Sequence, residues 1–168
     1  MVINLILSSL VFLGACSKDD ATNTTEMPSD ATTYTDVAYA TTSSAQKMDI
    51  YLPAGDGPFP VVVFIHGGAV LMGDKAMEAS NAAVLVANGY AAVSINYRLS
   101  GEAIFPAQIQ DCKAAIRYIR ANAATYKINP DKIASWGASA GGNLSALLGT
   151  SGDVAELEGG ELGNSNFS

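Results

Sequence analysis

Apolar and polar positions along the chain predict five strands. Two of the segments alternate in character, and the polar stretch between them, residues 41–45, predicts a hairpin turn. The other three are short and rich in apolar residues, which is typical of strands buried on both faces of a sheet. The predicted strands are Thr35–Ala40, Gln46–Leu52, Val61–Ile65, Ala91–Ile95 and Lys132–Trp136.

Three further segments have the spacing of helices. In the longest, Pro106–Thr125, apolar residues recur at intervals of three and four, and Asn129-Pro130 is expected to close the loop beyond it. The other two predicted helices are Met77–Asn88, with Gly89 as its C-cap, and Ala140–Leu148. Strands that alternate with helices imply an α/β fold, with a mostly parallel sheet and helices on both faces. After Thr150 the periodic pattern stops, and residues 151–168 are expected to form a loop.

Length and charge limit what the chain can be. Its 168 residues fit one domain, and a hydrophobic content of 49% is enough for a packed core. The net charge of -7 and the isoelectric point near 4.4 argue against a nucleic-acid partner, because phosphate binding needs a basic surface.

The amino-terminal stretch has the features of an export signal. Residues 1–15 are largely apolar and too short to span a bilayer comfortably, which predicts a signal peptide. They end in Leu13-Gly14-Ala15-Cys16, which resembles the lipobox of bacterial lipoproteins, so Cys16 is expected to carry lipid. Residues 16–33 are polar and predict a disordered tether, which leaves residues 34–168 for the folded domain. The alternatives are an ordinary cleaved secretory peptide and a wrongly chosen start.

These features predict where the protein resides. It is expected to be exported and anchored by lipid to the bacterial cell envelope, with that lipid as its only contact with a membrane. Ser17-Lys18-Asp19-Asp20 is similar to the acidic tether that some lipoproteins use to reach the outer surface. The remaining cysteine, Cys112, falls within the longest predicted helix and is expected to be a buried, reduced thiol.

The first candidate for chemistry is a glycine-rich turn. Gly137-Ala138-Ser139-Ala140-Gly141 is a G-x-S-x-G pattern between a predicted strand and a predicted helix. Glycines let the backbones approach closely at such a turn, and the serine hydroxyl is then exposed at the carboxyl end of the sheet. The positive end of the new helix favours a developing oxyanion at the same place. Ser139 is therefore the candidate nucleophile, and a turn without chemistry is the alternative.

A second motif follows the predicted strand Val61–Ile65. There His66-Gly67-Gly68-Ala69 places small residues at a strand end, where backbone N–H groups can turn toward a common point and form an oxyanion hole. His66 itself is expected to form hydrogen bonds within the structure rather than to transfer protons.

Together the two motifs resemble the α/β-hydrolase fold, in its esterase/lipase branch with an HGG-type oxyanion loop. The resemblance covers residues 34–167 and points to bacterial acetyl-xylan and feruloyl esterase-like proteins. It implies that Ser139 accepts the acyl group and that Gly67 shapes the loop. The implied donors of the oxyanion hole are the N–H groups of Gly68, Ala69 and Ala140. The segments that carry the likeness are His66–Lys75, Asn96–Ser100, Phe105–Arg117 and Ile128–Ile133.

Three departures from the family pattern matter. Val70 and Asn143 stand where the family commonly has tryptophan and histidine. The resemblance also places the carboxylate and histidine of the triad after later strands, whereas the single histidine here precedes the serine. We therefore expect that only the amino-terminal part of the fold is present and that the base lies beyond residue 168. The strand before Ser139 would then be a bare sheet edge, so an isolated 168-residue chain is expected to be poorly soluble and nearly inactive.

Other charged residues near the motifs are expected to be structural. Asp74 and Lys75 follow the oxyanion loop, and neither is expected to act in catalysis. Arg98 and Asp111 are expected to pair and to brace the loop after the strand Ala91–Ile95.

The resemblance implies a serine carboxylic-ester hydrolase that works through an acyl-enzyme. Short acyl or feruloyl esters of polysaccharide are the expected substrates, and no metal or cofactor is expected. One alternative is an amide hydrolase of the same fold, similar to formamidases or some oligopeptidases. Another is a non-catalytic lipoprotein that uses the scaffold for binding.

Overall fold

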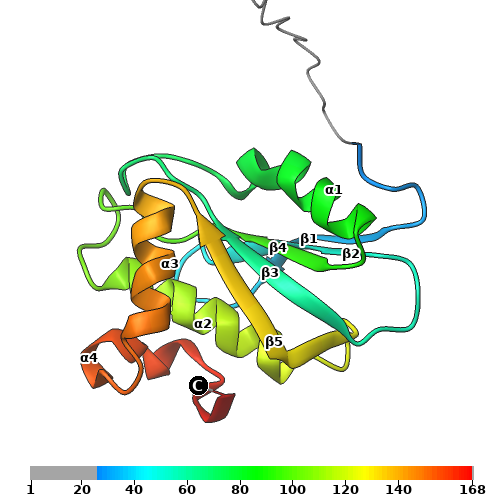
Figure 1. Cartoon of the computed structure of the whole chain (residues 1–168). Helices are drawn as coiled ribbons and strands as arrows, with labels where there is room; N and C mark the ends of the chain where they lie inside the picture. The colour runs from blue at the N-terminus through cyan, green and yellow to red at the C-terminus, as the bar shows by residue number, and fades with distance from the viewer. Residues whose placement is uncertain (1–25, 168) are drawn as a thin grey trace, which may run out of the picture.

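The computed structural model describes residues 26–167, which form a mixed five-stranded sheet with helices on both faces (Figure 1). The strands lie in the order β1-β2-β4-β3-β5. Strand β3 runs parallel to β4 and β5, whereas β2 runs antiparallel to β1 and β4. The expected sheet was mostly parallel; within the described residues only β4, β3 and β5 are. The strands are β1 (Thr32–Ala38), β2 (Lys47–Leu52), β3 (Phe59–Ile65), β4 (Ala91–Ile95) and β5 (Ile128–Gly137).

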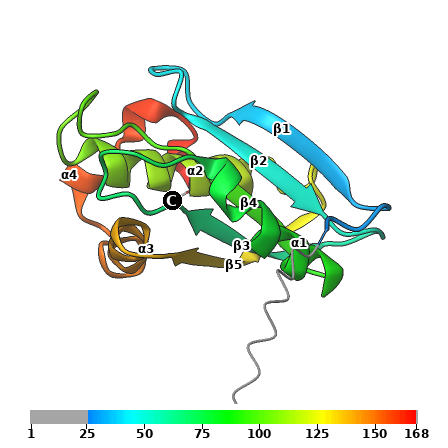
Figure 2. The same ribbon diagram turned by 90° about the horizontal axis from the view of Figure 1, so that it is seen from above.

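The helices divide between the two faces of the sheet. Helix α1 (Ala79–Ala87) packs on one face through a small cluster that includes Phe64 and Val86. Helices α2 (Ala107–Ala121) and α3 (Ala140–Thr150) pack on the other face, as the view from above also shows (Figure 2). The shorter helices are η1 (Lys75–Glu78), α4 (Ala155–Glu158), η2 (Gly160–Leu162) and η3 (Ser165–Phe167). No helix in the described part of the chain is long and apolar enough to cross a membrane.

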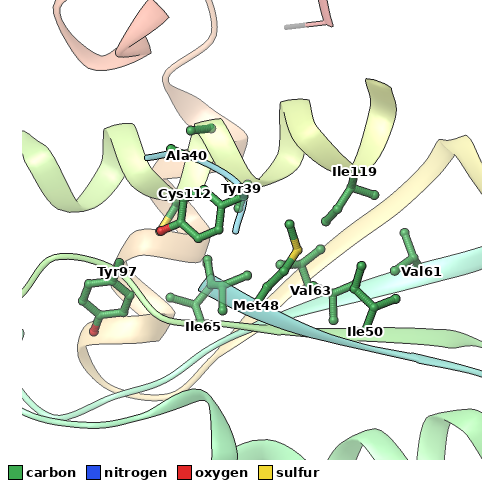
Figure 3. Packing of buried hydrophobic residues seen from close by; sticks show 14 of the residues in the cluster. Tyr39, Ala40, Met48, Ile50, Val61, Val63, Ile65, Tyr97, Cys112 and Ile119 are labelled. Atoms are coloured by element: carbon green, nitrogen blue, oxygen red, sulfur yellow. The ribbon is translucent and has the colours of Figure 1, made fainter. Parts of the chain in front are cut away.

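The main core lies between the sheet and α2 (Figure 3). Val63 and Ile65 of β3 are completely buried there against Ile109 and Cys112 of α2. Apolar residues at intervals of three and four on α2 create this contact, as the sequence pattern predicts. Cys112 is a free, buried thiol, as expected, and burial raises its pKa well above the usual range for cysteine.

Two predicted boundaries around β5 were wrong. Helix α2 ends at Ala121 rather than at Thr125, and β5 begins at Ile128 rather than at Lys132. Asn129-Pro130 therefore lies within a strand and not in a loop. The ladder with β3 is irregular there, since it passes from Phe59↔Ile128 to Val61↔Ile133. Proline has no N–H to donate, and it is tolerated at such an interruption of the ladder.

The segment after Thr150 is folded, in contrast to the loop expected there. It forms α4, η2 and η3, and buried Arg117 of α2 holds it in place. The guanidinium of Arg117 donates to the carbonyl oxygens of Glu158 at 2.7 Å, Gly159 at 2.9 Å and Gly163 at 3.1 Å. Lys113 of α2 donates to the carbonyl oxygen of Ser151 at 2.6 Å and pairs with the Glu158 carboxylate.

The folded domain also begins earlier than residue 34. Strand β1 starts at Thr32, and Met27 and Ala31 pack against the cluster beneath α1. These apolar contacts order the part of the expected tether that the structure describes. The predicted signal peptide, residues 1–15, and the lipid site Cys16 lie outside the described residues.

The expected Arg98–Asp111 pair is confirmed. The Asp111 carboxylate is completely buried and accepts from Arg98 Nη2 at 2.8 Å and Arg98 Nε at 2.9 Å. It also accepts from the Arg98 N–H at 2.8 Å and from Gln46 Nε2 at 2.8 Å. The hydrogen bonds that the Arg98 guanidinium donates to Asp111 raise the pKa of Arg98 further above its ordinary value. One carboxylate thus joins α2 to the loops before β2 and after β4.

Replacing Asp111→Ala should lower the free energy of unfolding by about 3–5 kcal/mol, because the buried Gln46 and the partly buried Arg98 lose their acceptor. Urea unfolding measures this change. Asp56→Ala, in an exposed loop, is the matched control and should change stability by less than about 0.5 kcal/mol. A loss below about 1 kcal/mol for Asp111→Ala would contradict the bracing role.

Candidate active site

Ser139 occupies a strained turn between β5 and α3. Its backbone angles are φ 54° and ψ -119°, a region that residues other than glycine rarely adopt. The residue is exposed, and its hydroxyl forms no cap hydrogen bond with the helix that follows. An exposed serine with a strained backbone and no capping hydrogen bond, at the carboxyl end of a strand, has the geometry of a nucleophile elbow.

Two glycines allow the turn to pack against the end of β3. A Cβ built on Gly141 would lie 2.0 Å from the carbonyl oxygen of Ile65 and 2.8 Å from that of His66. A Cβ on Gly137 would lie 2.3 Å from the carbonyl carbon of Gly141. Each of these neighbours is backbone and cannot rotate away, so both positions require glycine.

The loop after β3 reaches the same turn. A Cβ on Gly67 would lie 2.9 Å from the carbonyl oxygen of Ala138 and 3.7 Å from the Cβ of Ser139. Beyond it the chain turns tightly at Gly68, with φ 109°, and the Gly68 carbonyl accepts from Leu71 N at 2.9 Å and Met72 N at 3.1 Å. The structure therefore brings together the two motifs that the sequence singled out.

The three N–H groups expected to form the oxyanion hole donate no hydrogen bond within the described part of the chain. Among the hydrogen bonds of residues 26–167, none uses the N–H of Gly68, Ala69 or Ala140. Ala140 begins α3, where the first backbone N–H groups lack intrahelical partners and the helix dipole is positive. These N–H groups are therefore available to stabilise negative charge. Their roles, and the role of Ser139, stay predictions.

His66 is a structural residue, as expected. It is 1% exposed, and its ring stacks on Tyr97 with the centroids 4.4 Å apart. Its Nδ1 lies 2.8 Å from the Gly67 carbonyl oxygen, and since a carbonyl only accepts, Nδ1 carries the proton. The Tyr97 hydroxyl in turn donates to the His66 carbonyl at 2.9 Å. Burial and the nearby Cys112 raise the pKa of Tyr97 to about 12, so it remains a neutral donor.

Sequence reasoning missed the partners of Lys75. The Lys75 ammonium lies 2.8 Å from Asp49 of β2 and 3.2 Å from Asp36 of β1. Its backbone N–H donates to Asn96 Oδ1 at 2.6 Å. The one available signal was Asp49, an acidic residue within an otherwise largely apolar strand.

Asp74 has a structural role, because it is the N-cap of η1. Its side chain accepts from Ala76 N at 2.8 Å and from Asn96 Nδ2 at 2.9 Å, and these two hydrogen bonds lower its pKa. Across the described residues, no three His, Cys, Asp or Glu side chains lie close enough together to hold a metal ion.

Comparison with known proteins identifies the class. Residues 48–168 match the model of the BD-FAE family, an α/β-hydrolase-type domain, and the chain belongs to this family. This chain is 40% identical to esterase LipC of Mycobacterium tuberculosis over 93 residues. The aligned segment covers 55% of this chain and 23% of LipC.

Two solved structures extend the comparison. A bifunctional GH43-CE protein of Bacteroides eggerthii is 43% identical with a TM-score of 0.69, over 76% of this chain and 18% of that one. A truncated carbohydrate esterase from gut microbiota is 41% identical with a TM-score of 0.69, over 82% of this chain and 51% of that one. The chain spans only 23% to 32% of the length of the first curated relatives.

Gly141→Ala should lower the free energy of unfolding by at least about 1–3 kcal/mol, because the added methyl group collides with the backbone of β3. Gly149→Ala is a matched control in the same helix, where a Cβ would meet nothing within 4 Å. That substitution should raise stability by up to about 1 kcal/mol, because alanine favours a helix over glycine. Thermal and urea unfolding of both variants measure the difference. Equal effects would show that the turn does not depend on close backbone packing.

Proposed function

We propose that this chain carries the nucleophile and the oxyanion loop of a serine carboxylic-ester hydrolase. The observation that carries the proposal is the contact between the two motifs. Ser139, whose backbone is strained, lies next to Gly67, and this contact supports an oxyanion hole built from the N–H groups that follow Gly67. The similarity to esterase LipC and to a carbohydrate esterase supports the same reaction class.

The proposed reaction is acyl transfer in two steps. Ser139 Oγ bonds to the ester carbonyl carbon while its proton passes to a histidine from outside these 168 residues. The carbonyl oxygen becomes an oxyanion and accepts hydrogen bonds from the N–H groups of Gly68, Ala69 and Ala140. The C–O bond to the alcohol then breaks, and the histidine returns its proton to the leaving alkoxide. Water attacks the acyl-enzyme by the same route and releases the acid.

His66 does not fit the role of that base. Its ring is enclosed by Tyr97, and its Nδ1 proton is held by the Gly67 carbonyl. A general base must reach the nucleophile and be oriented by an acceptor such as a carboxylate. We therefore assign His66 to fixing the start of the oxyanion loop, and the triad histidine and carboxylate to other parts of the complete protein.

Short acyl or feruloyl esters of polysaccharide are the proposed substrates. The loops near the candidate site expose four apolar side chains, which suits an acyl or aromatic group: Leu71, Met72, Ile104 and Phe105. Ser100 joins the two loops, since its N–H and hydroxyl donate to the Val70 carbonyl at 2.8 and 3.1 Å. The likeness to a carbohydrate esterase favours an alcohol component of carbohydrate.

The proposed location is the bacterial cell envelope. The lipobox-like sequence before Cys16 supports lipidation of that cysteine, followed by a polar tether to the domain. Metabolic labelling with a fatty-acid analogue tests this assignment. Label should be incorporated into the exported protein and be lost in Cys16→Ser.

Ser139→Ala in the complete protein should lower kcat for p-nitrophenyl acetate by roughly 10⁴–10⁶-fold, because no other group supplies the attacking oxygen. A fluorophosphonate probe should label Ser139 in the unsubstituted protein, as peptide mass spectrometry would show. Ser80→Ala, an exposed serine on α1, is the control and should keep full activity. Retained activity or labelling in Ser139→Ala would overturn the assignment, and cleavage of anilides but not esters would favour the amide-hydrolase alternative.

A further inference from the structure

The oxyanion loop, residues 66–75, is held at both ends. At its start, Gly67 packs on Ala138, and the His66 ring stacks on Tyr97. At its far end Gly73 packs on His66 and Gly67, since a Cβ there would lie 2.2 Å from His66 Nδ1. The chain then passes into Asp74 and Lys75, whose polar contacts attach this end to the sheet. The N–H groups of Gly68 and Ala69 lie between these ends, so their direction depends on both.

We propose that Lys75 is a positioning residue of the oxyanion loop, fixed by its ion pair with Asp49. This inference rests on the proposed function, because it concerns the placement of the donors that would stabilise the oxyanion. It concerns a residue that the motifs themselves do not identify as functional.

The ion pair is largely shielded from water. The side chains of Lys75 and Asp49 are 12% and 7% exposed, and their charged atoms lie 2.8 Å apart. Burial alone would lower the pKa of Lys75, but the hydrogen bonds to Asp49 and Asp36 outweigh it and raise the pKa. Lys75 therefore stays charged, and a shielded pair of this kind holds its geometry more firmly than an exposed one.

An irregularity in β1 brings a second carboxylate, that of Asp36, to the Lys75–Asp49 ion pair. The register with β2 shifts between Tyr34 and Val37, and Asp36 within that bulge has φ 55°. The shift lets the Asp36 N–H donate to Asp49 Oδ1 at 2.8 Å while its carboxylate lies 3.2 Å from the Lys75 ammonium. Bulges beside functional sites commonly redirect a side chain in this way.

The backbone around Lys75 is tied to β4 as well. Asn96, just after β4, accepts from Lys75 N at 2.6 Å and donates to Asp74 Oδ2 at 2.9 Å. Ser94 of β4 donates to the Lys75 carbonyl oxygen. Residues 74 and 75 are thus attached to β1, β2 and β4, which leaves the loop end little freedom to move.

The direct test is Lys75→Met in the complete protein. We expect kcat for p-nitrophenyl acetate to fall by about 10- to 100-fold with KM changed less than about threefold, because oxyanion donors act in the transition state. Lys75→Arg should restore most of kcat. Lys113→Met is the matched control, since Lys113 is also a shielded, ion-paired lysine but lies on α2 and holds the segment after Thr150. It should lower thermal stability while leaving kcat within about twofold.

The double variant Lys75→Met/Asp49→Asn separates positioning from simple destabilisation. It removes the pair without leaving a buried charge unpaired. The proposal predicts that kcat stays low in this variant. Recovery of kcat would show that the single variant suffered only from the stranded Asp49 carboxylate, and would overturn the proposal.

Hydrogen exchange supplies a readout that needs no turnover. Amides of residues 66–74 should exchange at least about tenfold faster in Lys75→Met than in the unsubstituted protein, and should be unchanged in Lys113→Met. Unchanged exchange in Lys75→Met would refute the positioning role. If the unsubstituted protein hydrolyses no ester, the proposed function fails, and exchange alone then decides the inference about the loop.

Discussion

The close approach of two backbones at the end of β3 determines the geometry around Ser139. The Ile65 carbonyl lies where a side chain at Gly141 would begin, so α3 can start only if that position has no Cβ. Because α3 starts there, Ser139 is forced into its unusual backbone conformation at the strand end. The position of the serine is thus a consequence of packing between β3, β5 and α3.

The loop that would supply the oxyanion hole depends on the same strand. It leaves β3 at Ile65, passes over the turn at Gly67, and is fastened again where Lys75 meets β1, β2 and β4. Buried His66 and the Arg98–Asp111 pair hold the neighbouring loops. The candidate site is therefore supported mainly by the central sheet and by polar contacts at its carboxyl end.

Much of this arrangement could be predicted from local sequence patterns. The strand Ala91–Ile95 has the predicted bounds, and the elbow and the HGG loop could be recognised because glycine requirements are local. The fold after Thr150 could not, since it depends on hydrogen bonds from distant Arg117 rather than on its own periodicity. The Lys75–Asp49 pair was missed for a similar reason: only the folded sheet brings its partners together. The start of β5 was also missed, because Pro130 was expected to lie in a loop, whereas the irregular ladder at that point accommodates a residue without an N–H.

A crystal structure of the complete protein after reaction with a phosphonate ester would test the central claim most directly, because the tetrahedral phosphorus imitates the acyl-transfer intermediate. The account predicts phosphorus bonded to Ser139 Oγ, with its phosphoryl oxygen about 2.7–3.1 Å from the backbone nitrogens of Gly68, Ala69 and Ala140. A phosphoryl oxygen that faces solvent, or phosphorus bonded to another residue, would contradict it.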